Sequence, residues 1–158
     1  RDLSSCASTT RGVFGGGEVS TTKQNMIDYI TIASTGNAQD FGDLTVARMY
    51  ISSSSNSERG LFGGGYTGSN SNVIDYITIA STGNATDFGD LVAATQSPSA
   101  TSNQLRVVFA GGNSGSVTNV MQFVTIASTG DTTDFGDLTV ATTRMNAGTI
   151  SGAHGGLA

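Results

Sequence analysis

An internal repeat is the feature that most constrains how this chain can fold. Three segments, 25–44, 72–91 and 119–138, align without a gap at a spacing of 47 residues. The first and second are identical at 18 of 20 positions, and the second and third at 14 of 20. Such a repeat means that one supersecondary unit recurs along the chain and that neighbouring units bury a common core.

A second repeated element precedes each of these segments. It reads RGVFGGG from Arg11, RGLFGGG from Arg59 and RVVFAGG from Arg106, with a shorter GAHGG at 152–156. A stretch of small residues comes before each copy, as in MYISSSSNSE at 49–58. We therefore divide the chain into units at 1–48, 49–95 and 96–142, with 143–158 as the first half of a fourth unit.

The sequence of each complete unit predicts four short β-strands. The segments are rich in Thr, Ile, Val, Tyr and Phe, they end at glycine, and they lack the 3.6-residue period of a helix. In the second unit the expected strands are 51–57, 61–65, 74–79 and 88–92. The run 73–79 is apolar at both odd and even positions, which predicts a strand covered on both faces by stacked sheets.

Four strands in 47 residues, with a glycine doublet or triplet, are typical of a β-propeller blade. The units resemble kelch repeats, in which an arginine and a small-residue innermost strand precede a Gly-Gly strand, a Tyr-Asp strand and an aromatic outer strand. Here the pair is reversed, as in Asp75-Tyr76, and Phe88 stands for the usual tryptophan. The resemblance implies an all-β fold of kelch-like β-propeller blades, each a four-stranded antiparallel sheet, with three complete blades plus a half blade. Propellers have four to eight blades, so we expect further blades from a longer chain or from homo-oligomerisation.

Composition excludes several classes of partner. The net charge is −5 and Lys23 is the only lysine, so no basic stripe is present to bind nucleic acid. Cys6 is the only cysteine, which excludes an intrachain disulfide and a zinc site of several thiolates, and we expect it to be buried as a small hydrophobe. No apolar run is long enough for a transmembrane helix, so we expect no membrane insertion.

The motifs that suggest catalysis or metal binding have simpler structural interpretations. Asp-Phe-Gly occurs at 40–42, 87–89 and 134–136, and we expect its phenylalanine to pack between blades and its aspartates to bond turn amides. Asn84, Asp87 and Asp90 are candidate calcium ligands, but they lack EF-hand spacing. His154 is the single histidine and has no partner nucleophile. We therefore predict no metal, no cofactor and no enzymatic activity.

The residues leading into the innermost strands are the candidate ligand-binding set: Arg1, Arg48, Thr95 and Arg144. In kelch propellers that bind ligands, residues at this position surround one mouth of the central channel. The resemblance thus implies donors for an acidic peptide or a sugar. A second set, Arg11, Arg59 and Arg106, begins the second strands, and we expect it to bond carbonyl groups between blades or to cap the surface.

The string ITIASTGNATDFGDL, together with RGVFGGG, resembles repeats in structural proteins of marine bacteriophages, chiefly those of cyanobacteria. This resemblance implies a virion or extracellular location, in a tail fibre or appendage, with a host-surface glycan or a neighbouring virion protein as partner. Two alternatives stay open. One is a purely architectural propeller that binds only protein in a filament or oligomer, and the other is a fragment of a kelch-type sugar-active enzyme.

Overall fold

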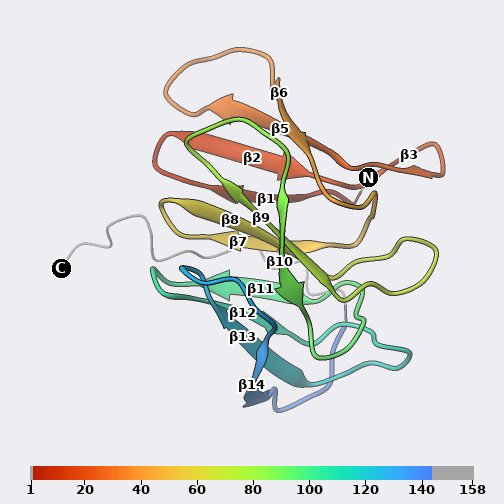
Figure 1. Ribbon diagram of the computed structural model, residues 1–158. Helices are drawn as coiled ribbons and strands as arrows, with labels where there is room; N and C mark the ends of the chain where they lie inside the picture. The colour runs from red at the N-terminus through yellow and green to blue at the C-terminus, as the bar shows by residue number, and fades with distance from the viewer. Residues whose placement is uncertain (1, 144–158) are drawn as a thin grey trace.

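The computed structural model describes residues 2–143, which form three four-stranded antiparallel sheets and one two-stranded hairpin. The first sheet holds β1 (Ser4–Ala7), β2 (Arg11–Gly15), β5 (Met26–Thr31) and β6 (Gln39–Asp43). The second holds β7 (Ser52–Ser55), β8 (Arg59–Gly63), β9 (Val73–Thr78) and β10 (Thr86–Asp90). The third holds β11 (Ser99–Ser102), β12 (Arg106–Ala110), β13 (Val120–Thr125) and β14 (Thr133–Asp137). The sheets follow one another from the red to the blue part of the chain (Figure 1).

Within each sheet, strands that are consecutive in the repeat pair with each other in the same register. Ser52 is opposite Gly63 in the second sheet, as Ser4 is opposite Gly15 in the first. The expectation of an all-β fold with four strands per unit is confirmed. The boundaries differ by a residue or two: β8 begins at Arg59 because Arg59 already pairs with Thr78 of β9.

The first unit contains a hairpin that the repeat did not predict, formed by β3 (Glu18–Val19) and β4 (Thr22–Lys23). Ser20 and Thr21 at its tip both have positive φ angles, of 45° and 73°. Two central residues with positive φ are the geometry of a type I′ hairpin turn. The first unit is one residue longer here than the others, and the extra residue lies in this loop.

The hydrophobic core lies between the sheets. One cluster joins residues of the first and second sheets, including Val13, Phe41 and Ile77. A second cluster joins the second and third sheets and includes Phe88 and Phe109. The expectation that the phenylalanine of Asp-Phe-Gly packs between units is confirmed for Phe41 and Phe88, and Cys6 is buried as expected.

The innermost strands lie side by side, with β7 between β1 and β11 (Figure 1). All four serines of β7 are buried. The Oγ atoms of Ser4 and Ser53 are 2.7 Å apart, and Ser54 donates to Ser102 over 2.7 Å. Short hydroxyl side chains therefore let three strands approach one another and also satisfy their own hydrogen bonds.

The glycine doublets after the second strands have backbone conformations that are unfavourable for other residues. Gly64 has a φ of 68°, and a Cβ atom there would lie 2.5 Å from the carbonyl oxygen of Thr95. Gly65 likewise has a positive φ, of 112°. Glycine is therefore favoured at Gly64 both by the positive φ and by the close approach of the connecting segment.

No helix that could span a membrane is found among residues 2–143.

Candidate functional site: the faces between the sheets

Three connecting segments follow the outer strands, and each is anchored by the same backbone hydrogen bond. The amides of Gly17, Gly65 and Gly112 donate to the carbonyl oxygens of Arg48, Thr95 and Thr142 over 3.0, 2.8 and 2.8 Å. Arg48, Thr95 and Thr142 therefore occupy equivalent positions in successive connectors.

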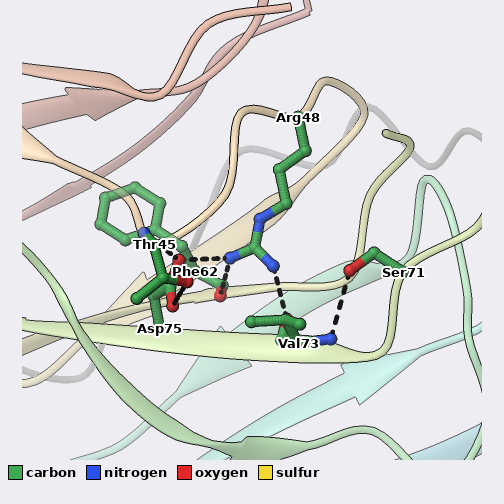
Figure 2. A network of polar contacts seen from close by, with 6 residues as sticks. All are labelled: Thr45, Arg48, Phe62, Ser71, Val73 and Asp75. Atoms are coloured by element: carbon green, nitrogen blue, oxygen red, sulfur yellow. Dashed lines mark hydrogen bonds and ion pairs between the residues drawn. The ribbon is translucent and has the colours of Figure 1, made fainter. Parts of the chain in front are cut away.

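Arg48 joins the first two sheets. Its amide donates to the carbonyl of Gln24 in the first unit, while its side chain extends over the second sheet. Nη1 donates to the carbonyl of Val73 over 2.9 Å, and Nη2 donates to that of Phe62 over 3.2 Å and to Asp75 Oδ2 over 2.8 Å (Figure 2). The guanidinium is fully buried, so its donors serve the interior of the protein.

Asp75 on β9 is the anion of this pair and is also fully buried. Its carboxylate accepts hydrogen bonds from the amide and the hydroxyl of Thr45, at 3.3 and 2.5 Å (Figure 2). Burial raises the pKa of Asp75, whereas the positive charge of Arg48 and the hydrogen bonds from Thr45 lower it. Burial lowers the pKa of Arg48, and the charge of Asp75 raises it. The two charges are thus held in the interior by each other and by hydrogen bonds.

The second interface carries a neutral set at the same positions. Gln122 replaces Asp75, and its Oε1 accepts from the amide of Val92 over 2.8 Å and from the hydroxyl of Thr132 over 2.6 Å. Thr95 replaces Arg48, and its hydroxyl donates to the carbonyl of Ala93. The acid and the arginine are therefore exchanged together for an amide and a hydroxyl.

Two members of the other arginine set bond across the interfaces as expected. Nη1 of Arg11 donates to the carbonyl of Ile79, and Nη1 of Arg59 donates to that of Ile126, both over 2.8 Å. Arg106, the third member, is exposed and lies 4.4 Å above the ring of Phe123.

Asn84, one of the residues considered for calcium, instead bonds the backbone of the first unit. Asn84 Oδ1 accepts from the amide of Asp43 over 3.0 Å, and Asp131 accepts in the same way from the amide of Asp90. Burial raises the pKa of Asp90, and the charges of Asp131 and Asp87 raise it further. Within residues 2–143, no group of three or more His, Cys, Asp or Glu side chains could hold a metal ion.

Two of the four expected ligand donors, Arg48 and Thr95, lie in the described part of the chain. Both are buried: the side chain of Arg48 donates to the second sheet, and the hydroxyl of Thr95 donates to Ala93 in its own connector. Arg1 and Arg144 lie outside the described residues. The register also separates them from the set: Arg48 comes four residues before Ser52, but Arg1 comes three before the equivalent Ser4. Thr142, rather than Arg144, has the equivalent connector position.

The two outer faces of the stack expose residues that the inner interfaces bury. Ile32 on the first sheet is 54% exposed, whereas its equivalents Ile79 and Ile126 are each 1% exposed. Phe135 on the third sheet is 51% exposed, whereas Phe41 and Phe88 are each 2% exposed. Each end of the stack thus presents one half of an interface that is complete in the interior.

Sequence reasoning missed the role of Asp75. Asp75 forms a buried ion pair with Arg48 of the connector. A signal was present in the repeat, because positions 48 and 75 change together to Thr95 and Gln122.

In comparisons with known proteins, no family model and no curated protein matched the chain.

Proposed function

We propose that the three sheets are kelch-like blades of a β-propeller, and that the chain is a non-enzymatic structural module that binds further protein of its own repeat type. The observation that carries this proposal is the exposure of Ile32 and Phe135 at positions that are buried between neighbouring sheets. A repeat array buries its core through contacts between neighbours, so an end unit without a neighbour leaves apolar surface in water. Added units, from the same polypeptide or from another, would cover both faces.

A virion appendage or tail fibre is the location we propose, on the strength of the phage-like repeat string. The sequence suits a particle exposed to salt, because only 12% of its residues are charged and screened ion pairs on a surface contribute little. The proposed partner there is a neighbouring virion protein that continues the propeller.

Protein, rather than a host-surface glycan, is the partner that the contacts favour. The guanidinium of Arg48 is buried, and its Nη1 and Nη2 donate to Val73, Phe62 and Asp75, so it is not presented to a sugar. We expect a glycan array probed with the assembled protein to show no hit. Reproducible binding to one glycan class would favour the adhesion hypothesis instead, and turnover of a sugar substrate would favour the enzyme alternative.

Mass measurement on material from the original source tests the proposal. We expect either a native particle heavier than its denatured chain or a denatured chain several times heavier than 16.0 kDa, because both arrangements cover the end faces. A native particle of 16.0 kDa that contains no further units would contradict it. In a particle built from several chains, Phe135→Asp and Ile32→Asp are expected to lower the native mass. Val140→Asp is the control, because Val140 is 71% exposed and its equivalent Val46 is also exposed inside the stack.

A further inference from the structure

The outer face of the first sheet carries an aspartate at the position that Asp75 holds in the second sheet. This aspartate indicates which residue a partner unit must provide. Asp28 lies opposite Phe14 on β2 and Asp40 on β6. Asp75 lies in the same way opposite Phe62 and Asp87 in the second sheet. Asp28 is therefore the equivalent of the aspartate that is buried against Arg48.

The apolar surroundings of Asp28 also match those of Asp75. Phe14 and Ile30 are half-buried and Ile32 is exposed, whereas their equivalents Phe62, Ile77 and Ile79 are buried. At the first internal interface, these positions are covered by the preceding unit and its connector. The same surface is therefore seen twice in the chain, once covered and once open.

The connector that covers such a face must provide a cation when the face carries an aspartate. Asp75 meets Arg48, whereas the neutral Gln122 meets Thr95 in the next interface. Burial of a carboxylate without a paired cation is strongly unfavourable, so the two versions of the interface are not interchangeable.

The far end of the described stack does not offer that cation at the required position. Thr142 occupies the connector position of Arg48, as the bond from Gly112 to its carbonyl shows. If a second copy of this chain docked its third sheet on the first sheet, a threonine would face Asp28. The two ends of the stack thus expose apolar residues of the interface, but they do not provide its charge pair.

We propose that the outer face of the first sheet docks another unit of the same repeat whose connector carries an arginine at the position of Arg48, and that Asp28 is the buried ion-pair partner of that arginine. This inference rests on the proposed function, because it requires a further unit to stack on the first sheet. It adds that the further unit is recognised through an ion pair between its arginine and Asp28.

The test is a lengthened chain in which a second copy of residues 1–48 precedes Arg1. This places the added arginine four residues before Ser4, the same spacing that separates Arg48 from Ser52. We expect the added copy to raise the urea midpoint of the chain. Arg48→Thr in the added copy is expected to lower the equilibrium constant for folding by at least about a hundredfold, because the original Asp28 is then buried without a cation. Combining it with Asp28→Gln is expected to restore most of that loss.

Two controls separate docking from a failure to fold. Asp28→Gln in the unlengthened chain is expected to change stability little, since its face is open. In a Cys6→Ala background, a thiol introduced by Ile32→Cys is expected to react with an alkylating reagent in the unlengthened chain and to be protected in the lengthened one.

The possible failures are distinguishable. If the added copy neither raises the midpoint nor protects position 32, sheets do not stack here and the proposed function fails together with this inference. If the added copy stabilises equally with arginine or threonine, the stacking holds and the assignment of Asp28 is overturned. Self-association of the unlengthened chain that Ile32→Asp abolishes would also overturn the requirement for arginine, because its connector offers Thr142.

Discussion

At the scale of single residues, Arg48 and Asp75 show how a buried charge pair acts in this protein. A buried ion pair adds little net stability compared with a neutral, hydrogen-bonded set, because desolvation offsets the attraction. Losing one partner is different, since the other charge is then left in the interior. The second interface has uncharged residues at the same backbone positions, so the charged and the uncharged interface can be compared directly.

Arg48→Thr is expected to lower the free energy of unfolding by about 3–5 kcal/mol, because Asp75 is left buried and unpaired. Adding Asp75→Gln and Ala85→Thr copies the neutral set of the second interface and is expected to recover most of that loss. Urea unfolding of the single and combined variants is the measurement. Equal instability of the single and the combined variant would contradict this account.

Cys6 makes stability depend on pH above neutrality. Burial raises the pKa of the Cys6 thiol from 9.0 to about 12, so the unfolded chain ionises at lower pH than the folded protein. Between these values the unfolded state releases a proton that the folded state keeps, and stability falls as pH rises, by about 1 kcal/mol between pH 8 and 10. Cys6→Ala lacks this contribution. We therefore expect the stability difference between wild type and Cys6→Ala, measured by urea unfolding, to shift by that amount between the two pH values; a constant difference would show that the thiol is not desolvated.

At the scale of strands, the outer strand of each sheet contains a bulge at the glycine of Asp-Phe-Gly. Gly89 has a φ of 146°, and a Cβ atom there would lie 2.4 Å from the backbone of Gly130 in the next unit. Gly136 has a similar φ of 131°, but nothing lies within 4 Å of its Cβ position. The glycine thus serves both the bulge and the contact with the following unit.

Comparing Gly89 with Gly136 distinguishes the cost of backbone strain from the cost of a clash between units. Gly136→Ala is expected to lower stability by about 1–3 kcal/mol, the range for strained backbone. Gly89→Ala carries the same strain and is expected to lower it by about 1–3 kcal/mol more, because backbone atoms of Gly130 block the new methyl group. Thermal and urea unfolding of both variants give the comparison. Equal losses would mean that the loop around Gly130 moves aside.

The sequence predicted strands better than it predicted contacts. Segments rich in β-forming residues and ending at glycine predicted the four strands per unit, and repetition of Phe41 and Phe88 indicated packing between units. The role of Arg48 could not be found in this way, because matching arginines by residue type ignores the backbone register. The burial of Asp75 also depends on a connector that lies 30 residues away in the sequence.

At the scale of the whole molecule, the three sheets form a stack in which only the middle one is covered on both sides. The second sheet contributes to both core clusters, whereas each outer sheet contributes to one. Mutating the same residue in different units therefore measures how much a neighbouring sheet adds to the stability of the protein.

Phe88 and Phe135 provide that contrast. Phe88→Ala is expected to lower the free energy of unfolding by about 3–5 kcal/mol, the usual range for a buried phenylalanine. Phe135→Ala is expected to lower it by less than about 1 kcal/mol, since half of its side chain is already in water. Urea unfolding of the two variants tests this. A loss for Phe135→Ala as large as that for Phe88→Ala would mean that the third sheet is already covered in solution.

The serine-lined centre of the stack has a consequence for how such proteins change in evolution. Hydroxyl groups can donate or accept, and the short side chains of β7 place no bulky group between it and the neighbouring strands β1 and β11. A duplicated unit inserted into the chain would find the same hydroxyls on both sides, without a bulky side chain that fixes one angle between sheets. The contacts among β1, β7 and β11 are thus compatible with a change in the number of units. The residues on the outer faces determine which units can pack against each other.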